Sequence, residues 1–149
     1  MKIKIIGNLI SVFILGNLIS IFILSIFWTV TPTLGDSSGG QPRVIEIIAD
    51  KDNTFKVPGQ SKAFITLKPG EKIVLRITSY FGGEKARDNS VHSLVVKKLR
   101  DQGWDMRLKE GTADFPLVAP STPGEYFAEC TVKCGRGHDE MNMKIIVKN

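Results

Sequence analysis

The chain has 149 residues and a formal net charge of +5, and acidic and basic residues are interleaved beyond its apolar start. This length allows one domain and one appendage. A nucleic-acid-binding protein gathers its basic residues in a patch or stripe, so the interleaved charge argues against nucleic acid as a partner.

Residues 1–30 are predicted to form a membrane anchor. After Lys2 and Lys4 no charged residue occurs before Asp36, and residues 5–30 are almost wholly apolar. A helix of about 20 such residues spans a bilayer. A cleaved signal peptide would have a shorter apolar core and a small-residue cleavage pattern, which we do not find. We therefore expect a single-pass protein of the cell membrane, with a cytoplasmic N-terminus and an extracytoplasmic remainder.

Residues 31–43 are rich in proline, glycine and serine and are predicted to be a linker. Residues 44–149 show a β pattern, with short branched runs separated by turn signals such as Pro69-Gly70. Such a pattern predicts an antiparallel sandwich. The expected strands are Val44–Ala49, Ala63–Leu67, Lys72–Ser79, Val91–Lys97, Phe115–Val118, Glu125–Cys130 and Asn142–Lys148.

The residues with distinctive chemistry gather between the last two expected strands. Cys130, Cys134, His138 and Met141 follow the spacing C-x3-C-x3-H-x2-M. The chain has two cysteines and two histidines in all, and only His92 lies elsewhere, at the start of another expected strand. Thiolate, imidazole and thioether together form a soft ligand set that suits copper.

Four interpretations of this set are open on spacing alone. Outside the cytoplasm two cysteines normally pair as a disulfide. A single-copper blue site would use Cys134, both histidines and Met141, and would leave Cys130 without a role. A zinc site would use both cysteines and both histidines and leave Met141 idle. A site with two copper ions would employ every residue, with the thiolates as bridges.

The spacing, together with the upstream His92 on a predicted β-sandwich, resembles the CuA domain of haem-copper oxidase subunit II. Nitrous oxide reductase and some nitric oxide reductases carry a similar domain. The resemblance covers about Val44 to Asn149, and the single N-terminal helix resembles that of one-helix bacterial and archaeal subunits II. It implies an all-β, cupredoxin-like Greek-key sandwich with one transmembrane helix and two copper ions.

The resemblance also implies a role for each ligand. Cys130 and Cys134 match the bridging thiolates, His92 and His138 the terminal imidazoles, Met141 the weak thioether ligand, and Val132 the residue whose backbone carbonyl completes the set. Many relatives have Glu at the position of Val132, and that Glu helps to bind magnesium. We therefore expect no magnesium at this position.

Other departures from the family concern the electron partners. The aromatic cluster that receives electrons from cytochrome c in many relatives has no clear match. Trp104 is either an exposed replacement for that cluster or a cap on the sandwich core, and we favour the core position. The anchor carries no acidic residue, which weakens a proton-pumping interpretation. Lys133 and Arg136 in the copper loop would favour an acidic or neutral donor.

We therefore expect an electron-transfer subunit with no substrate chemistry of its own. It would accept electrons from a soluble carrier such as cytochrome c and pass them to a haem-copper subunit I that reduces oxygen or nitric oxide. The alternatives are a free-standing, membrane-tethered copper protein that carries electrons or delivers copper, and a structural zinc or disulfide domain without a redox role.

Overall fold

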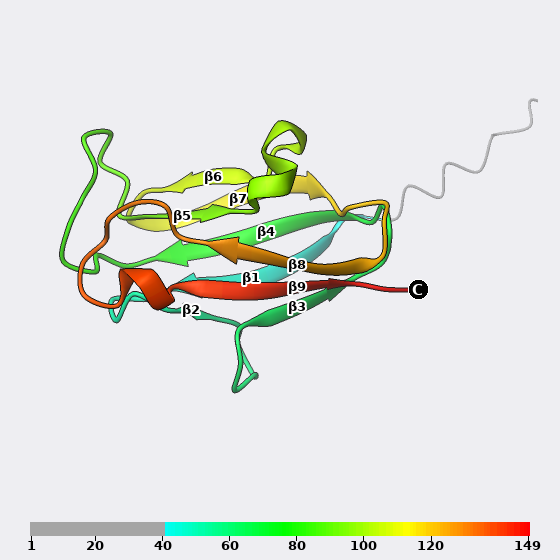
Figure 1. The fold of residues 1–149 in the computed structure, drawn as a ribbon, viewed down its shortest axis with the longest axis horizontal. Helices are drawn as coiled ribbons and strands as arrows, with labels where there is room; N and C mark the ends of the chain where they lie inside the picture. Colours follow the sequence, from blue (N-terminus) through cyan, green and yellow to red (C-terminus); the bar gives the residue numbers. More distant parts are fainter. Residues whose placement is uncertain (1–40) are drawn as a thin grey trace, which may run out of the picture. The chain divides into compact units, whose positions relative to one another are not determined.

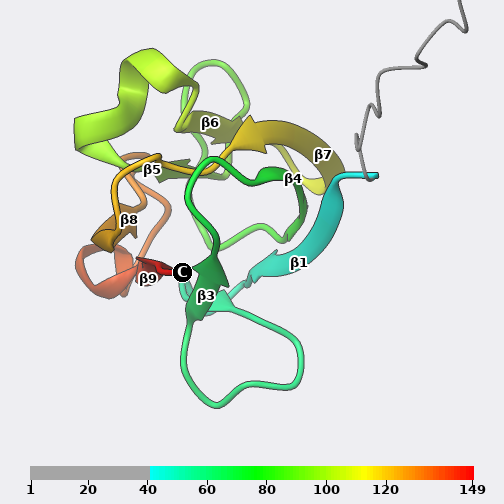
Figure 2. The same ribbon diagram turned by 90° about the vertical axis from the view of Figure 1, so that its right-hand side faces the viewer.

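Residues 41–149, which the computed structural model describes, fold into two β-sheets packed against each other (Figure 1). One sheet has the strand order β2-β1-β4-β7 and the other β3-β9-β8-β5-β6. Figure 2, turned by 90°, shows β1 and β8 on opposite sides of the sandwich. The strands are β1 (Arg43–Ala49), β2 (Phe55–Lys56), β3 (Phe64–Leu67), β4 (Lys72–Ser79), β5 (His92–Val95), β6 (Asp105–Leu108), β7 (Gly111–Val118), β8 (Gly124–Glu129) and β9 (Asn142–Val147).

Two strand pairs are parallel, which corrects the antiparallel sandwich expected from the sequence. β1 runs parallel to β4 along its whole length, and β3 runs parallel to β9. After β1 the chain adds the short β2, crosses to the other sheet as β3, and returns as β4 beside β1. Alternation of apolar side chains shows which face of a strand is buried, but it carries no information on the direction of the neighbour.

The core lies between the two sheets and is built by alternation. β4 occupies the predicted range, and Ile73, Leu75 and Ile77 are buried while their neighbours face outward. Met143, Ile145 and Val147 do the same on β9. The other expected strands are all present, with ends shifted by one to four residues, but the sequence pattern missed β2 and β6. Both missed strands are too short for alternation to be distinctive.

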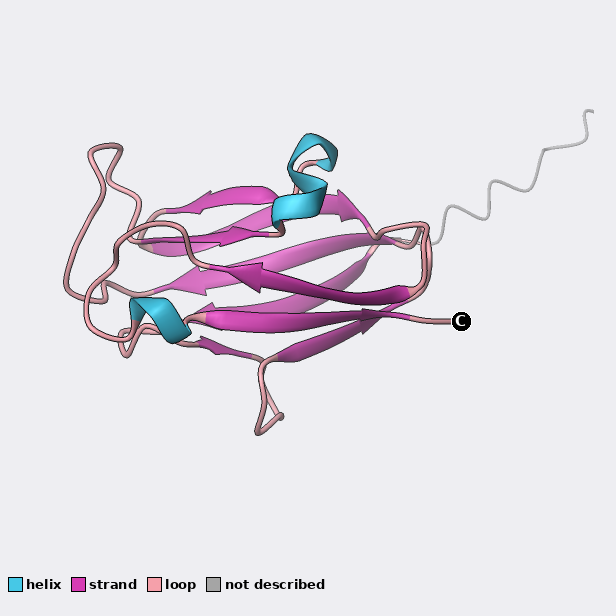
Figure 3. Cartoon of the chain, viewed as in Figure 1, coloured by secondary structure: helices cyan, strands magenta, loops and turns pink. Residues whose placement is uncertain are grey.

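The segment of chain that connects β5 to β6 covers part of the core. The chain forms the 3-10 helix η1 (Lys97–Gln102), drawn in cyan in Figure 3, which ends at Gly103 with a positive φ of 89°. That backbone turn directs Trp104 inward, where it is fully buried and its indole N–H donates a hydrogen bond to the Val118 carbonyl (3.1 Å). Trp104 is therefore a core residue, and the exposed alternative is wrong.

The loops that carry the predicted ligands lie at one end of the sandwich. β4 and β8 end there and β5 and β9 begin there, at the end opposite the C-terminus in Figure 1. Loops 80–91 and 130–141 therefore meet, and the Glu84 amide donates to the Cys134 carbonyl (3.2 Å). Within residues 41–149 no helix is long and apolar enough to span a bilayer. The predicted anchor lies outside these described residues.

Candidate metal centre

The loop between β8 and β9 is closed at its base by a backbone hydrogen bond. The last pair of the two strands is Glu129 with Asn142, and one step further the Cys130 amide donates to the Met141 carbonyl (3.0 Å). Within the loop a second 3-10 helix, η2 (His138–Glu140), follows Gly137, whose positive φ of 91° favours glycine. The loop thus folds back on itself and turns its ligand side chains inward.

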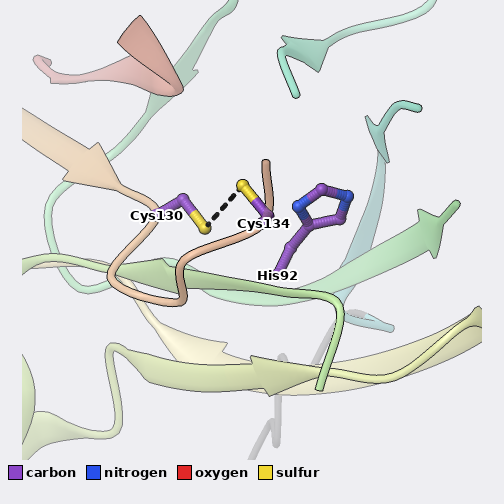
Figure 4. Close-up of side chains that lie close together, drawn as sticks. All are labelled: His92, Cys130 and Cys134. Carbon is purple, nitrogen blue, oxygen red and sulfur yellow. Dashed lines mark hydrogen bonds between the residues drawn. The ribbon is translucent and has the colours of Figure 1, made fainter. Parts of the chain in front are cut away.

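The two cysteines face each other inside this end of the sandwich (Figure 4). Both are free and buried, and their Sγ atoms lie 3.8 Å apart. A disulfide requires about 2.05 Å, so the thiols are near neighbours without being joined. Cys130 follows β8 directly and Cys134 lies in the loop, so the two sulfur atoms approach from different backbone directions.

His92 reaches the thiols from β5. Its side chain is fully buried, and its ring lies within 4.8 Å of both sulfur atoms. The ring Nε2 pairs with the Tyr80 carbonyl at 2.8 Å. A carbonyl only accepts, so Nε2 must carry the proton and Nδ1 holds the free lone pair of the neutral ring. Nδ1 is buried and has no hydrogen-bond partner.

The remaining predicted ligands surround the same sulfur atoms. The Val132 carbonyl accepts a hydrogen bond from the Cys130 thiol (3.2 Å). His138 Nδ1 lies 3.6 Å from Cys134 Sγ, and Met141 Sδ lies 3.8 Å from the same atom. Met141 is buried, whereas His138 is half-buried. The structure therefore brings all six predicted residues to one place.

Ser93 replaces missing sheet contacts beside Cys130. β5 and β8 pair in register only at Val95 and Glu129. Beyond that point the Ser93 amide donates to Cys130 Sγ (3.4 Å), and the Thr131 amide donates to Ser93 Oγ (2.7 Å). Side-chain sulfur and oxygen thus accept the bonds that carbonyl groups would accept in a continuous ladder.

Burial sets the protonation of this cluster. Burial first, and the neighbouring Cys130 second, raise the pKa of the Cys134 thiol to about 12. Burial also lowers the pKa of His92, so its ring is neutral at pH 7. Two buried thiols and an imidazole with an unpartnered lone pair fit a cation, because a metal would supply the positive charge that thiolates need there. The donor set of sulfur and nitrogen favours copper or zinc over a hard cation.

Sequence reasoning missed the residues that hold the ligands. Ser93 and Tyr80 contact Cys130 and His92, and Asn53 contacts the loop that contains Cys134. None of them has a spacing that ties it to the ligands. One available signal was the polar Ser93, which lies between His92 and the apolar Leu94 in β5.

Comparison with known proteins gives a result at the level of the fold. No protein-family model matches the chain, and no curated protein matches its sequence significantly. Among solved structures, one similar chain belongs to a heme-copper terminal oxidase dimer, with 20% identity and a TM-score of 0.51. The alignment covers 72% of this chain and 66% of that chain, so the similarity spans just under two thirds of the oxidase chain.

Two further solved structures are similar at lower scores. The periplasmic domain of cytochrome oxidase subunit II from Bradyrhizobium japonicum is 14% identical, with a TM-score of 0.48, over 72% of this chain and 84% of that chain. Auracyanin from Roseiflexus castenholzii is 17% identical, with a TM-score of 0.46, over 71% of this chain and 97% of that chain.

Residues 41–149 thus form an all-β sandwich with a cupredoxin-like fold and a buried His/Cys/Cys cluster. The resemblance to the oxidase CuA domain that the sequence predicts is confirmed at the level of this fold.

Proposed function

We propose that the chain carries electrons through a binuclear copper centre of the CuA type. The proposed ligands are His92, Cys130, the Val132 carbonyl, Cys134, His138 and Met141. Two copper ions between two thiolates would take up and release one shared electron. The support comes from the cupredoxin-like fold and from the geometry of the two sulfur atoms.

One observation carries this proposal. Two free, buried thiols lie 3.8 Å apart beside an imidazole whose Nδ1 has no partner. A single-copper site would leave one of the thiols without a role. A structural disulfide would leave the buried Nδ1 and the Met141 thioether unexplained. Two metal ions held by both thiols would give every one of these atoms a function.

The residues around the thiols favour electron transfer over copper delivery. Delivery requires that a partner's ligands reach the metal, whereas Cys134 is fully buried and Cys130 is only 6% exposed. Tyr80 orients the His92 ring, and Ser93 orients Cys130. Fixed ligands and excluded water keep the geometry similar in both oxidation states, which favours a fast exchange of electrons.

The half-buried His138 and the exposed Tyr80 mark the surface at which a redox partner would approach. Lys133, which directly precedes Cys134, is exposed. Its Nζ lies 3.9 Å from Glu84 Oε2 in the neighbouring loop. This pairing reduces the positive charge of the surface, so we propose a donor that is weakly charged or acidic. A soluble carrier such as cytochrome c would supply electrons, and a haem-copper subunit I would accept them.

We further propose that residues 1–30 hold the chain in the cell membrane, with the N-terminus in the cytoplasm and the copper domain outside it. Only Lys2 and Lys4 carry charge before the apolar run, and such residues stay on the cytoplasmic side. Protease added to intact cells should digest residues 41–149 and leave the N-terminus protected. Protection of the whole chain would contradict this orientation.

Metal analysis tests the copper proposal directly. The full-length chain, loaded with copper and freed of excess metal, should hold two copper ions and show an electron paramagnetic resonance spectrum split by two copper nuclei. Cys130→Ser and Cys134→Ser should each abolish that spectrum. One copper per chain, or a preference for a single zinc ion with no redox change, would contradict the binuclear centre.

A separate experiment tests the partner. Purification of the full-length chain from its native membrane in mild detergent should recover a haem-containing subunit. Recovery of the copper-loaded chain alone would instead support the free-standing electron carrier.

A further inference from the structure

A buried asparagine lies where three loops meet behind the candidate metal centre. Asn53 belongs to the turn between β1 and β2, and the residue is only 2% exposed. Its Nδ2 donates to the Gly82 carbonyl (3.1 Å) and to the Arg136 carbonyl (2.7 Å). Because both partners are carbonyl groups, the orientation of the amide is fixed by donor chemistry.

Asn53 keeps this position at a cost to the fold. Its backbone has a positive φ of 58°, and its buried Oδ1 has no hydrogen-bond partner. Unpaired buried acceptors and left-handed backbone each cost free energy and persist where the surroundings impose them. The turn itself is closed by two backbone hydrogen bonds, from the Asn53 amide to the Asp50 carbonyl (2.9 Å) and from the Asp50 amide to the Thr54 carbonyl (2.9 Å). The asparagine is therefore presented to the loops from a fixed support.

Close packing at two glycines shows how tightly the loops meet. A Cβ atom added to Gly82 would overlap Asn53 Oδ1, and one added to Gly135 would lie 2.7 Å from the Gly82 carbonyl oxygen. Gly135 directly follows Cys134, and the Gly82 loop begins at Tyr80, whose carbonyl orients His92. The contact between these two loops therefore lies beside Cys134 and close to Tyr80, the residue that orients the His92 ring.

We propose that Asn53 is a positioning residue for the metal centre, which clamps loop 80–84 to loop 134–138 so that the cluster is formed before a metal binds. The role of this clamp rests on the proposed function, but the two hydrogen bonds that form the clamp are present in the metal-free chain. Asn53 lies outside the proposed ligand set, and it acts through the two carbonyl groups that it binds.

Two substitutions of Asn53 remove the hydrogen bonds of the clamp and keep the backbone conformation of the turn. Asn53→Gly tolerates the positive φ and removes the amide, and Asn53→Asp keeps the shape but places an oxygen against two carbonyl oxygens. Asn89→Gly is the matched control, since Asn89 also has a positive φ (64°) but is exposed.

Hydrogen exchange of the metal-free, full-length chain measures the result. In both Asn53 variants, amides of residues 82–84 and 134–141 should exchange on the order of tenfold faster, because two hydrogen bonds are lost. Amides of β4 and β7 should not change, and Asn89→Gly should leave both loops as in the wild type. Unchanged loop exchange, or an equal rise in every strand, would overturn the proposal.

A double-mutant cycle gives a second, independent test. Gly82→Ala should speed exchange of loop 134–141 on its own, because its methyl group displaces the Asn53 side chain. In the Asn53→Gly background that effect should be clearly smaller, since the overlapping Asn53 side chain is gone and only the Cys134 carbonyl oxygen, 3.1 Å from the added Cβ, remains close. Additive effects would contradict a shared clamp.

The loaded chain connects the clamp to the metal. A chelator should remove copper from the Asn53→Gly and Asn53→Asp variants on the order of tenfold faster than from the wild type, with no loss of copper stoichiometry. Equal release rates would show that the clamp does not position the centre. If the wild type takes up no copper, the proposed function fails, while the exchange and cycle experiments still decide the clamp.

Discussion

His92 Nε2 donates a hydrogen bond to the carbonyl oxygen of Tyr80, at 2.8 Å, and this bond selects which nitrogen of the ring faces the two thiols. Tyr80 follows β4 in the other sheet, so the ring of a β5 residue is oriented across the sandwich. The arrangement fixes the tautomer without any charged partner.

Removal of the His92 ring should affect both stability and metal binding. In His92→Ala the Tyr80 carbonyl loses its donor, which should lower the free energy of unfolding of the metal-free chain by about 1–3 kcal/mol. The copper spectrum should lose the contribution of one terminal imidazole. Ser90→Ala is a matched control, because Ser90 Oγ is buried without a partner. This control should leave the melting temperature unchanged or slightly higher.

Ser93→Ala should loosen the backbone at Cys130. The Thr131 amide would lose its acceptor, and an unpaired amide costs about 1–3 kcal/mol of unfolding free energy. Chemical denaturation of the metal-free chain measures this loss. Thr131→Val removes only the hydroxyl that lies 3.0 Å from Ser93 Oγ, so it should cost less. If Thr131→Val lowered the unfolding free energy more than Ser93→Ala, the bond from the Thr131 amide to Ser93 would not be the main stabilising contact.

Trp104→Phe should reduce stability and leave electron transfer unchanged. The substitution removes the hydrogen bond to the Val118 carbonyl and part of a fully buried side chain, at a cost of about 1–3 kcal/mol. Stopped-flow reduction of the copper-loaded chain by its donor should proceed at the wild-type rate. A slowed reduction at unchanged copper content would restore Trp104 as a route for electrons.

Copper loading should release protons and weaken as the pH falls. The Cys134 thiol, with its pKa raised to about 12, is protonated in the metal-free chain at pH 7 and must lose its proton to bind as a thiolate. Each displaced proton should weaken the apparent affinity by about tenfold per pH unit of acidification. Titration with copper in a weakly buffered solution, followed by a pH electrode, measures the release. Loading without proton release would contradict thiolate coordination.

Asp88 should contribute stability that is lost in acid. Its hydrogen bond with Arg107, followed by the Ser90 amide, lowers the pKa of this carboxyl to about 2. A lowered folded-state pKa stabilises the fold above the unfolded value of 3.8, and this contribution disappears as the pH falls towards 2. The melting temperature of Asp88→Asn should therefore lie below that of the wild type at pH 7 and approach it near pH 2. Equal melting temperatures of Asp88→Asn and the wild type at pH 7 would contradict this contribution.

The ligand loop could be predicted from the sequence because its geometry is local. Cys130, Cys134, His138 and Met141 lie in one short connection, and their spacing alone brings them together once β8 and β9 pair. His92 can be identified from the sequence because the chain has only two histidines. Strand positions followed from alternation, which reports burial directly.

The parallel pairs and the support of the ligands could not be predicted in the same way. The pairing of β1 with β4 depends on a connection that crosses between sheets, and no short pattern encodes it. Asn53 is 83 positions from Arg136, whose carbonyl it binds, so the contact exists only in the folded chain. Trp104 was ambiguous because a large aromatic side chain after a turn is compatible with either a core or a surface position.

The single register pair between β5 and β8 has a consequence for how the molecule comes apart. His92 begins β5 and Cys130 directly follows β8, at the side where the two backbones diverge. An ion bound by both residues would therefore link two strands that share only one register pair. Separation of the β8–β9 hairpin from β5 would then require loss of the ion. A higher occupancy of the metal site should therefore increase the stability of the contact between β5 and β8.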